Sequence, residues 1–520
     1  MGAGGAMRIQ HQLLVVVAVL AGAGRGAADP APPPAVAPAV TAEAVAMRGP
    51  AAPLDGNDVG GVAEVRARGP AYRQSAWVPL LEAGVVVAGL NLLDRQVLGY
   101  EWARTDPQSA ARNLGNWRLD GDPFELNNLL HPYTGSLYYG AARSMGLGMW
   151  WSFGVASLGS AMWEIAGETE PASVNDQIMT SVGGSFLGEV LYRSAVLILC
   201  GGDEAPGFWR EGAAFLVSPP TGANRLMFGD RYRTFDFDWR PVTYLEASAG
   251  AAFDGLPGPG ATPAALLGLH LIHGLPGEDG WPVRHPFDHF DLQAGLRSGT
   301  RESFLSALFV RGMLAGSRVQ GSWSGIWGLA GLFDYAAPGP FHVSTAALAA
   351  ATTGQLGARG GVALQGTAVL GAGFGTAGAA FAPADGSGNH RGPAAQLALE
   401  SRLLLGSRGT IGAGLRQYLV AGAREAGGLE TQSHLALSGR LRIAGRHAVG
   451  LDWMDAWRWS RDPGAPGARQ RASELSVSYV LLSDRAFGAR PRRRVRRAGP
   501  APRASRAAGG PASRPPSPAG

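Results

Sequence analysis

The sequence predicts an α+β multidomain fold: a small helical domain followed by an antiparallel transmembrane β-barrel of about 10–12 strands. Three observations lead to this fold class. The N-terminus resembles an export signal, hydrophobic residues follow a helical period up to about residue 199, and they alternate with a period of two beyond about residue 213. The chain has 520 residues, enough for two separate cores, and only 16% of them are charged, which is low for a water-soluble protein.

Residues 1–28 have the composition of a signal peptide. Arg8 supplies a positive charge, Leu13–Leu20 form a short apolar core, and small residues follow at Gly26-Ala27-Ala28. The apolar core is too short to cross a bilayer comfortably, so we favour a cleaved signal over an uncleaved anchor. Residues 29–72 are rich in proline and alanine and predict a linker.

Residues 73–202 predict a helical domain, with candidate helices at 77–98, 132–145, 147–165 and 178–199. The third candidate is apolar enough to cross a membrane. The other three carry polar residues that would be costly in hydrocarbon, namely Glu82, Asn91, Arg143, Glu189 and Arg193. We therefore expect a compact bundle pressed against the membrane or the barrel, which either occupies the periplasm or partly plugs the barrel.

Residues 213–484 predict the barrel. In the segment 434–443, for example, Leu437 and Leu441 lie on one face and Arg440 on the other. Because lipid cannot satisfy the hydrogen bonds of an open sheet edge, a membrane-spanning sheet must close. A soluble β-sandwich is the alternative. Export and regular strands favour the barrel, whereas weak alternation in the Gly/Ala-rich stretch 343–380 leaves the strand number open.

Residues 485–520 predict a disordered tail that contains ten arginines and no acidic residue. The formal charge of +5 therefore conceals a net acidic body, and no nucleic-acid partner is predicted. The tail could contact acidic lipid head groups. Outer-membrane barrels commonly end in an aromatic residue, so we expect Tyr479 or Phe487 to supply that signal internally. The predicted partners are outer-membrane lipid and the barrel-assembly machinery.

Two motifs carry a family resemblance. His131 begins HPYTGSLYYGAARSMG, and Trp163 begins WEIAGETEPASVNDQIMTSVGGSFLGEVLYR. Over about residues 77–199 the chain resembles the bacterial domain of unknown function 3943. That family resembles exported envelope proteins with a β-rich C-terminal half, and the resemblance implies no particular activity.

The same region holds the residues that could carry chemistry. The candidates for general acid–base catalysis are His131, Glu164, Glu168 and Glu189. The candidates for a metal site are His131, Glu164, Glu168 and Asp176. Further polar residues of the motif are Asn127, Arg143, Glu170, Asn175 and Arg193.

Each candidate also has a structural interpretation. His131 precedes a proline and could cap a helix, and Asn175-Asp176 could form the N-cap of another. Glu189 and Arg193 are spaced for an i,i+4 ion pair. No zinc-protease motif, nucleophile elbow or phosphate-binding loop is present in the sequence, so no cofactor is predicted.

The sequence therefore favours a structural or binding role in the bacterial outer membrane. The alternative is an envelope hydrolase that acts on lipid or glycan, with its site in the helical domain. A passive pore is a third hypothesis, and it requires an open lumen.

Overall fold

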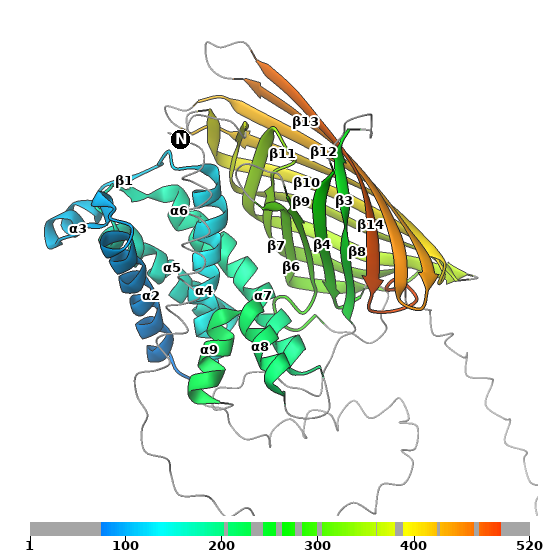
Figure 1. The fold of residues 1–520 in the computed structure, drawn as a ribbon, viewed down its shortest axis with the longest axis horizontal. Helices are drawn as coiled ribbons and strands as arrows, with labels where there is room; N and C mark the ends of the chain where they lie inside the picture. Colours follow the sequence, from blue (N-terminus) through cyan, green and yellow to red (C-terminus); the bar gives the residue numbers. More distant parts are fainter. Residues whose placement is uncertain are drawn as a thin grey trace, which may run out of the picture.

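In a computed structural model, the chain forms a helical domain that lies beside a closed β-barrel (Figure 1). The structure describes residues 74–201, 206–229, 243–255, 263–275, 283–298, 304–359, 361–379, 388–423, 427–461 and 467–489. The predicted signal peptide and linker, and the tail beyond residue 489, lie outside the described residues.

The helical domain consists of α-helices, one short 3-10 turn and three π-helical turns. In chain order they are α2 (Trp77–Gln96), η4 (Glu101–Ala103), α3 (Pro107–Asn113), η5 (Leu126–Leu130), α4 (His131–Ser144), α5 (Met149–Met162), η6 (Trp163–Gly167), α6 (Val174–Ile178), η7 (Met179–Gly183), α7 (Gly184–Leu199), α8 (Phe208–Val217) and α9 (Pro219–Phe228). Two short strands, β1 (Trp117–Arg118) and β2 (Ala172–Ser173), pair in parallel.

The four predicted helices correspond to α2, α4, α5 with η6, and the continuous run α6–η7–α7. Helix α4 packs on α7 and on α5, while α2 packs on α5 and α4. The domain therefore has α7 and η7 next to the barrel, α4 packed behind them, and α5 and α2 on its far side (Figure 1).

The barrel is closed and contains twelve strands, each antiparallel to both neighbours. They are β3 (Thr243–Asp254), β4 (Ala264–His273), β5 (Phe290–Arg297), β6 (Leu305–Val319), β7 (Trp323–Ala336), β8 (Phe341–Arg359), β9 (Val362–Ala379), β10 (Asn389–Leu405), β11 (Gly409–Ala421), β12 (Leu429–Ala444), β13 (His447–Arg461) and β14 (Ala468–Leu482). The predicted antiparallel barrel is thus confirmed at the upper end of its predicted size.

The predicted start of the barrel at residue 213 is wrong. Residues 208–228 form α8 and α9, and the first barrel strand begins at Thr243. Pro219 and Pro220 occupy the first turn of α9, where their fixed φ angles suit a helix. The apolar run before them is too short to define an alternating strand.

The two ends of the barrel differ in the length of their connections. At one end, here called the short-turn end, strands are joined by 320–322, 360–361, 406–408 and 445–446, and by the longer segment 274–289. The connections at the opposite end, the long-loop end, are 255–263, 298–304, 337–340, 380–388, 422–428 and 462–467.

Side chains alternate between the outer wall and the lumen as predicted. Leu437 is 47% exposed on the outside, whereas Arg440 points inward and pairs with Glu246 on β3 and Asp452 on β13. Apolar residues outside and charged residues inside are the pattern of a membrane-spanning barrel.

The lumen is crossed by polar contacts between strands that are not neighbours. Arg416 on β11 forms an ion pair with Asp334 on β7 at 3.4 Å, in addition to a pair with Glu400 on the neighbouring strand β10 at 2.6 Å. Its guanidinium also donates to Gln293 on β5, the strand diametrically opposite in the barrel order. Arg311 on β6 reaches Glu400 on β10 at 3.0 Å. These contacts join opposite walls near the middle of the barrel.

The segment 483–489 folds back from the end of β14 into the short-turn mouth. Phe487 is fully buried there among inward-facing residues, including Tyr244 and Leu404. The Asp484 carboxylate accepts hydrogen bonds from the backbone N–H groups of Ala486 and Gly488, which fixes the turn. The predicted tail boundary at residue 485 is therefore wrong, because residues 485–489 belong to the barrel. Phe487 lies in the lumen, whereas Tyr479 lies half-exposed on the outer wall.

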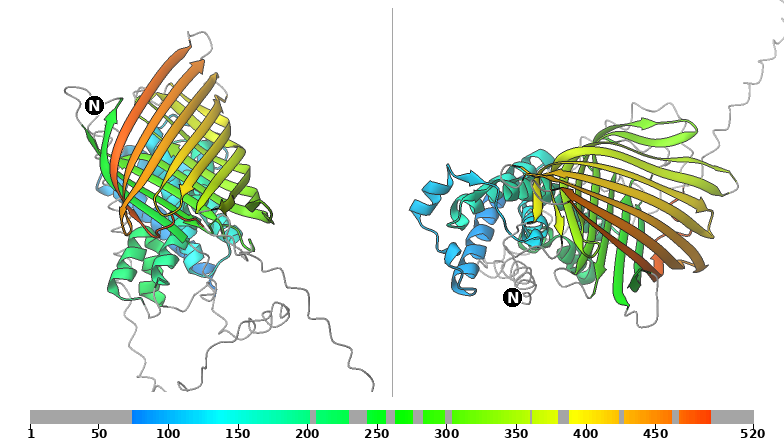
Figure 2. Two further views of the ribbon diagram at one scale, coloured as in Figure 1. Left: turned by 90° about the vertical axis from the view of Figure 1, so that its right-hand side faces the viewer. Right: turned by 90° about the horizontal axis from the view of Figure 1, so that it is seen from above.

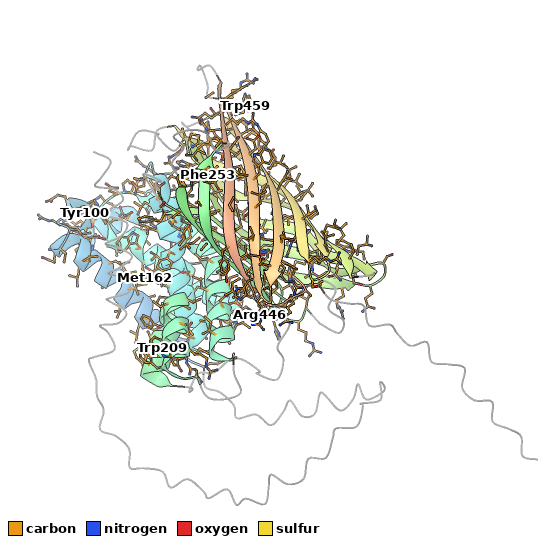
Figure 3. The ribbon with its side chains drawn as sticks, turned by 45° about the vertical axis from the view of Figure 1, so that its right-hand side comes forward. Tyr100, Met162, Trp209, Phe253, Arg446 and Trp459 are labelled. Carbon is orange, nitrogen blue, oxygen red and sulfur yellow. The ribbon has the colours of Figure 1, made fainter. Side chains whose placement is uncertain are left out.

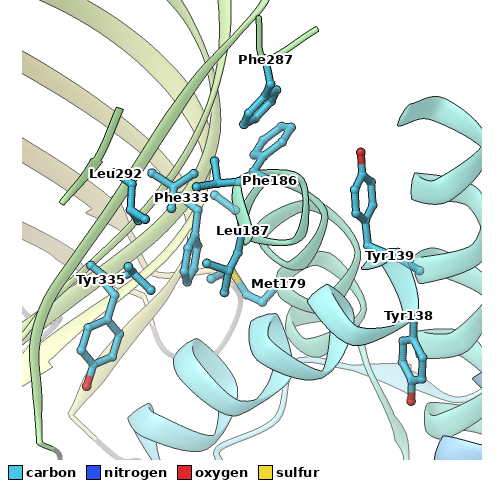
Figure 4. Close-up of a cluster of buried hydrophobic side chains, with 14 of the residues drawn as sticks. Tyr138, Tyr139, Met179, Phe186, Leu187, Phe287, Leu292, Phe333 and Tyr335 are labelled. Carbon is cyan, nitrogen blue, oxygen red and sulfur yellow. The ribbon is translucent and has the colours of Figure 1, made fainter. Parts of the chain in front are cut away.

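The helical domain packs against the outer wall of the barrel, not inside it (Figure 2). Asp334 points into the lumen, so its neighbours Phe333 and Tyr335 on β7 point outward. Both are fully buried in a cluster that includes Phe186 of α7 and Met179 of η7 (Figure 4). Of the placements that the sequence leaves open, the one in which the domain plugs the lumen is therefore incorrect.

Candidate functional site

Three of the predicted site residues converge inside the helical domain. The side chains of His131, Glu164 and Asp176 each place a nitrogen or carboxylate oxygen within 4.8 Å of the other two, and we call them the His–carboxylate cluster. The His131 Nε2 atom lies 3.5 Å from the Asp176 Oδ2 atom, and the two carboxylates are almost fully buried.

Each cluster residue lies at an interruption of regular helix. His131 directly follows the π-helical turn η5, Glu164 lies within η6, and Asp176 precedes η7 by three residues. The last of these turns also carries Thr180, whose hydroxyl is 3.2 Å from His131 Nδ1. Because π-helical turns insert an extra residue into a helix, they are frequent at functional sites. Here they turn three separate segments toward one point.

A second group of polar contacts surrounds the carboxylate of Asp120, which lies in the loop between β1 and η5. Its Oδ1 atom accepts hydrogen bonds from the side-chain amides of Asn127 at 2.7 Å and Asn175 at 3.0 Å. The backbone N–H of Asp122 donates to the same atom at 3.2 Å. In the described part of the chain, the buried Oδ1 atom of Asn127 has no hydrogen-bond partner. The Asn127 Oδ1 atom, at the edge of the cluster, is therefore available to accept a hydrogen bond or to bind a cation.

Glu164 and Glu168 are held by the backbone around them. The Glu164 Oε2 atom accepts from the backbone N–H of Ser173 at 2.8 Å. The Asn113 side chain donates to the carbonyl oxygens of both glutamates, at 3.3 and 3.0 Å. The two carboxyl groups also hydrogen-bond to each other, so Glu168 lies next to the cluster.

Burial lowers the pKa of the imidazole, whereas burial and neighbouring charges raise the pKa of two carboxyl groups. Burial lowers the pKa of His131 to about 4, so its imidazole is neutral at pH 7. Burial raises the pKa of the Glu164 and Glu168 carboxyls, and neighbouring carboxylates add to the effect. Burial would also raise the pKa of Asp120, but its hydrogen bonds lower it to about 2. A neutral imidazole beside crowded carboxyls can exchange their protons for a cation.

The barrel contributes to the edge of the site. Arg391, on the outer wall of β10, donates to the carbonyl oxygen of Asp122 at 3.0 Å. Phe124 stacks on His342 of β8, with ring centroids 3.6 Å apart. Both contacts lie at the long-loop end of the strands, so the cluster lies toward that end of the barrel.

Four of the other predicted residues lie apart from the cluster. Glu189 belongs to a separate buried ion network with Arg143 and Arg193, in which the predicted i,i+4 pair is present. Glu170 is exposed. Asn127 and Asn175 both contact Asp120. Asp120 was not among the predicted site residues, and it lies in the loop that follows the two-residue strand β1.

No curated protein matches the chain. Among solved structures, a loop-deletion mutant of OmpT, an outer-membrane protein of Vibrio cholerae, shares 7% identity, covers 46% of this chain and 98% of its own, and has a TM-score of 0.19. The COG4313 outer-membrane channel from Pseudomonas putida F1 shares 10% identity, covers 48% and 100%, and has a TM-score of 0.23.

A family comparison concerns the region that carries the cluster. Residues 116–220, which include all three cluster residues, match the domain of unknown function DUF3943, as the two sequence motifs predicted.

Proposed function

We propose that this chain is an outer-membrane protein whose helical domain binds a divalent cation through His131, Glu164 and Asp176. One observation carries the proposal: a neutral imidazole and two buried carboxylates converge within 4.8 Å. Three ligand atoms around one ion lie about 3.4–3.6 Å apart when each bond is about 2.1 Å. His131 Nε2 and Asp176 Oδ2 are already 3.5 Å apart, and side-chain movements of about 1 Å would bring all three groups to that spacing.

The donor set indicates the class of metal. One imidazole nitrogen with carboxylate oxygens suits Zn²⁺ or Mn²⁺ better than Ca²⁺, which prefers oxygen ligands alone. The Thr180 hydroxyl at His131 Nδ1 would orient the ring so that Nε2 faces the ion. The unpartnered Asn127 oxygen offers a further donor at the edge of the site.

The barrel supports an anchoring role for this domain. Outer-membrane barrels have short periplasmic turns and longer external loops. From that rule we infer that the His–carboxylate cluster, which lies toward the long-loop end, is on the external side of the membrane and not in the periplasm. Recovery of the mature chain in outer-membrane fractions, with faster gel migration before heating, would support a barrel in the outer membrane. Recovery in the soluble periplasm would refute it.

A melting experiment tests cation binding. The full chain would be folded in detergent, treated with a chelator, and melted with and without Zn²⁺, Mn²⁺, Mg²⁺ or Ca²⁺. Because a ligand that binds only the folded state stabilises it, Zn²⁺ or Mn²⁺ should raise the melting temperature. His131→Ala and Asp176→Asn should abolish the increase. His285→Ala, which removes a histidine whose side chain is 75% exposed, is the matched control and should retain it. No increase in the unmodified protein would refute the proposal.

Hydrolysis of an envelope lipid or glycan is the second candidate function. The observation that favours it is the number of protein ligands, because catalytic zinc sites have three and leave one position for water. Glu168, which hydrogen-bonds to Glu164, is placed to move a proton. Glu168→Gln should then abolish the release of product from lipid–detergent micelles and keep the metal-dependent melting shift. If the unmodified, metal-loaded protein releases no product, the binding role alone remains.

A further inference from the structure

The outer layer of the helical domain has an apolar surface that the fold leaves uncovered. The exposed side of α2 carries Trp77, Leu81, Val85 and Leu92, which follow one face of the helix. Trp77 and Leu81 are 77% and 70% exposed. An exposed apolar stripe of this length is unusual in a soluble domain and marks an interaction surface.

Helix α5 extends the same surface. Its exposed large residues are Trp150, Trp151 and Leu158, and the whole segment from Met145 to Trp163 contains no charged residue. Because α5 packs beside α2, the two exposed faces form one layer on the side of the domain away from the barrel (Figure 1).

The polar residues that argued against membrane insertion turn inward or find partners within the domain. The Glu82 carboxylate accepts a hydrogen bond from Asn224 of α9. The Asn91 side chain donates to the carbonyl oxygens of Ala103 and Gly167, at 2.8 Å each. None of these groups has to be inserted into lipid unpaired, so the energetic objection does not apply to the folded domain.

Arg143, Glu189 and Arg193 are likewise removed from this surface. They form a buried network between α4 and α7, on the barrel side of the domain.

Length and aromatic residues also fit a bilayer. The 20 residues of α2 span about 30 Å, the thickness of a hydrocarbon core. Both α2 and the continuous run Val174–Leu199 are long and apolar enough to cross a membrane, and only 28% of the most apolar window of α2 is buried.

Aromatic residues lie at the two ends of the domain, as at the two surfaces of a membrane. Figure 3 places Trp209 of α8 at the same end of the molecule as Arg446, in a short turn of the barrel, and Tyr100 toward the other end. Tyr100 stacks on Trp102 at 5.4 Å.

We propose that the helical domain is embedded in the lipid bilayer beside the barrel, with α2 and α5 facing acyl chains. Lipid is the partner of the α2 and α5 surface because the domain packs on a barrel wall whose remaining outward residues face lipid. The domain packs on the outward faces of β5–β8, and neighbouring outward residues of the same wall remain exposed, among them Leu329, Leu348 and Leu370. A domain that replaces lipid along a membrane-spanning wall has lipid on its own far side. This inference does not depend on metal binding.

Spin labels in the full chain test the proposal. Cys200 would be replaced by serine, and single cysteines introduced by Leu81→Cys, Val85→Cys and Leu158→Cys in protein reconstituted into phospholipid vesicles. Leu437→Cys, on the exposed outer wall, is the lipid-facing control. Glu101→Cys, at a side chain that is 80% exposed, is the aqueous control.

We expect labels at 81, 85 and 158 to behave like the label at 437. They should collide with oxygen, which concentrates in lipid, and lose the line broadening that a water-soluble nickel complex causes at 101. Broadening by nickel at 81 and 158 would show that this face meets water and would refute the proposal. Exclusion of both reagents would refute it in favour of a second copy of the chain or another protein.

Discussion

At the scale of single residues, Glu189 is the most tightly constrained charge of the helical domain. Its carboxylate is fully buried and accepts hydrogen bonds from the hydroxyl of Tyr139 at 2.7 Å, from Arg143 at 2.7 Å and from Arg193 at 2.6 Å. Arg193 also donates to the carbonyl oxygen of Pro286, in the segment that covers the outer wall of the barrel. One carboxylate therefore ties α4, α7 and the barrel together.

Glu189→Gln should be strongly destabilising, because it leaves the buried Arg143 without its counter-charge and Arg193 with only Asp288, 3.5 Å away. The expected loss is about 3–5 kcal/mol of unfolding free energy. Glu211→Gln breaks the partly exposed pair with Arg225 and is the matched control, with an expected loss below about 1 kcal/mol. Denaturant melts of the detergent-folded chain measure both. Losses of equal size would contradict a buried network.

Asp122 should make stability depend on pH. Burial, with the charges of Asp120 and Glu170, raises its pKa to about 6, well above the usual range of an aspartate. Between about pH 4 and pH 6 the folded state therefore binds more protons than the unfolded state does. The contribution of Asp122 to stability falls as the pH rises through this window.

Asp122→Asn removes this titration. The experiment measures the melting temperature of the variant minus that of the unmodified chain, with a chelator present. This difference should increase from pH 4 to pH 7, because the two proteins share all other titrating groups. A difference that is the same at both pH values would show that Asp122 titrates normally.

At the scale of elements, the crossing of α4 and α7 depends on glycine. A Cβ atom on Gly184 would lie 2.7 Å from the Gly135 Cα atom and 2.8 Å from the Pro132 carbonyl oxygen. The close approach also positions η7, since a Cβ on Gly135 would overlap the carbonyl oxygen of Thr180.

Gly184→Ala should destabilise the helical domain by about 1–3 kcal/mol, because backbone atoms must move apart to admit the methyl group. Gly154→Ala is the matched control. It adds the same methyl group on α5 with no atom within 4 Å, so the higher helix propensity of alanine should make it neutral or stabilising. Thermal melts followed by tryptophan fluorescence separate the two. Destabilisation by Gly154→Ala would indicate a covered α5 surface.

The elements differ in how far the sequence predicts them. Alternation specifies the barrel strands because each residue on a strand faces either lipid or lumen, as Leu437 and Arg440 do. Convergence of His131, Glu164 and Asp176 was one hypothesis among several, because an inserted residue rotates the rest of a helix by about 100° and π-helical turns have no clear sequence signal. Glu189 was grouped with them for the same reason. The side of the barrel wall on which the bundle lies depends on long-range packing, which periodicity does not encode.

At the scale of the whole molecule, the lumen has two barriers in series. The ion pairs of Arg416 with Asp334 and of Arg311 with Glu400 cross its middle, and the segment 483–489 fills its short-turn mouth. Ion flow through barriers in series is limited by the narrower one, so the structure argues against the passive pore among the three initial hypotheses.

This arrangement predicts a non-additive response in planar-bilayer conductance. The unmodified protein should conduct little. A chain that ends at Leu482 lacks the mouth segment, and the charge-neutral pair Arg416→Ala with Glu400→Ala removes the central contacts, but each change leaves the other barrier in place. Both single alterations should therefore stay close to the unmodified conductance, whereas their combination should raise it markedly. Heat-modifiable gel migration would show that every variant forms a closed barrel. Full opening by either alteration alone would mean that the two barriers are not independent, and high conductance of the unmodified protein would restore the pore hypothesis.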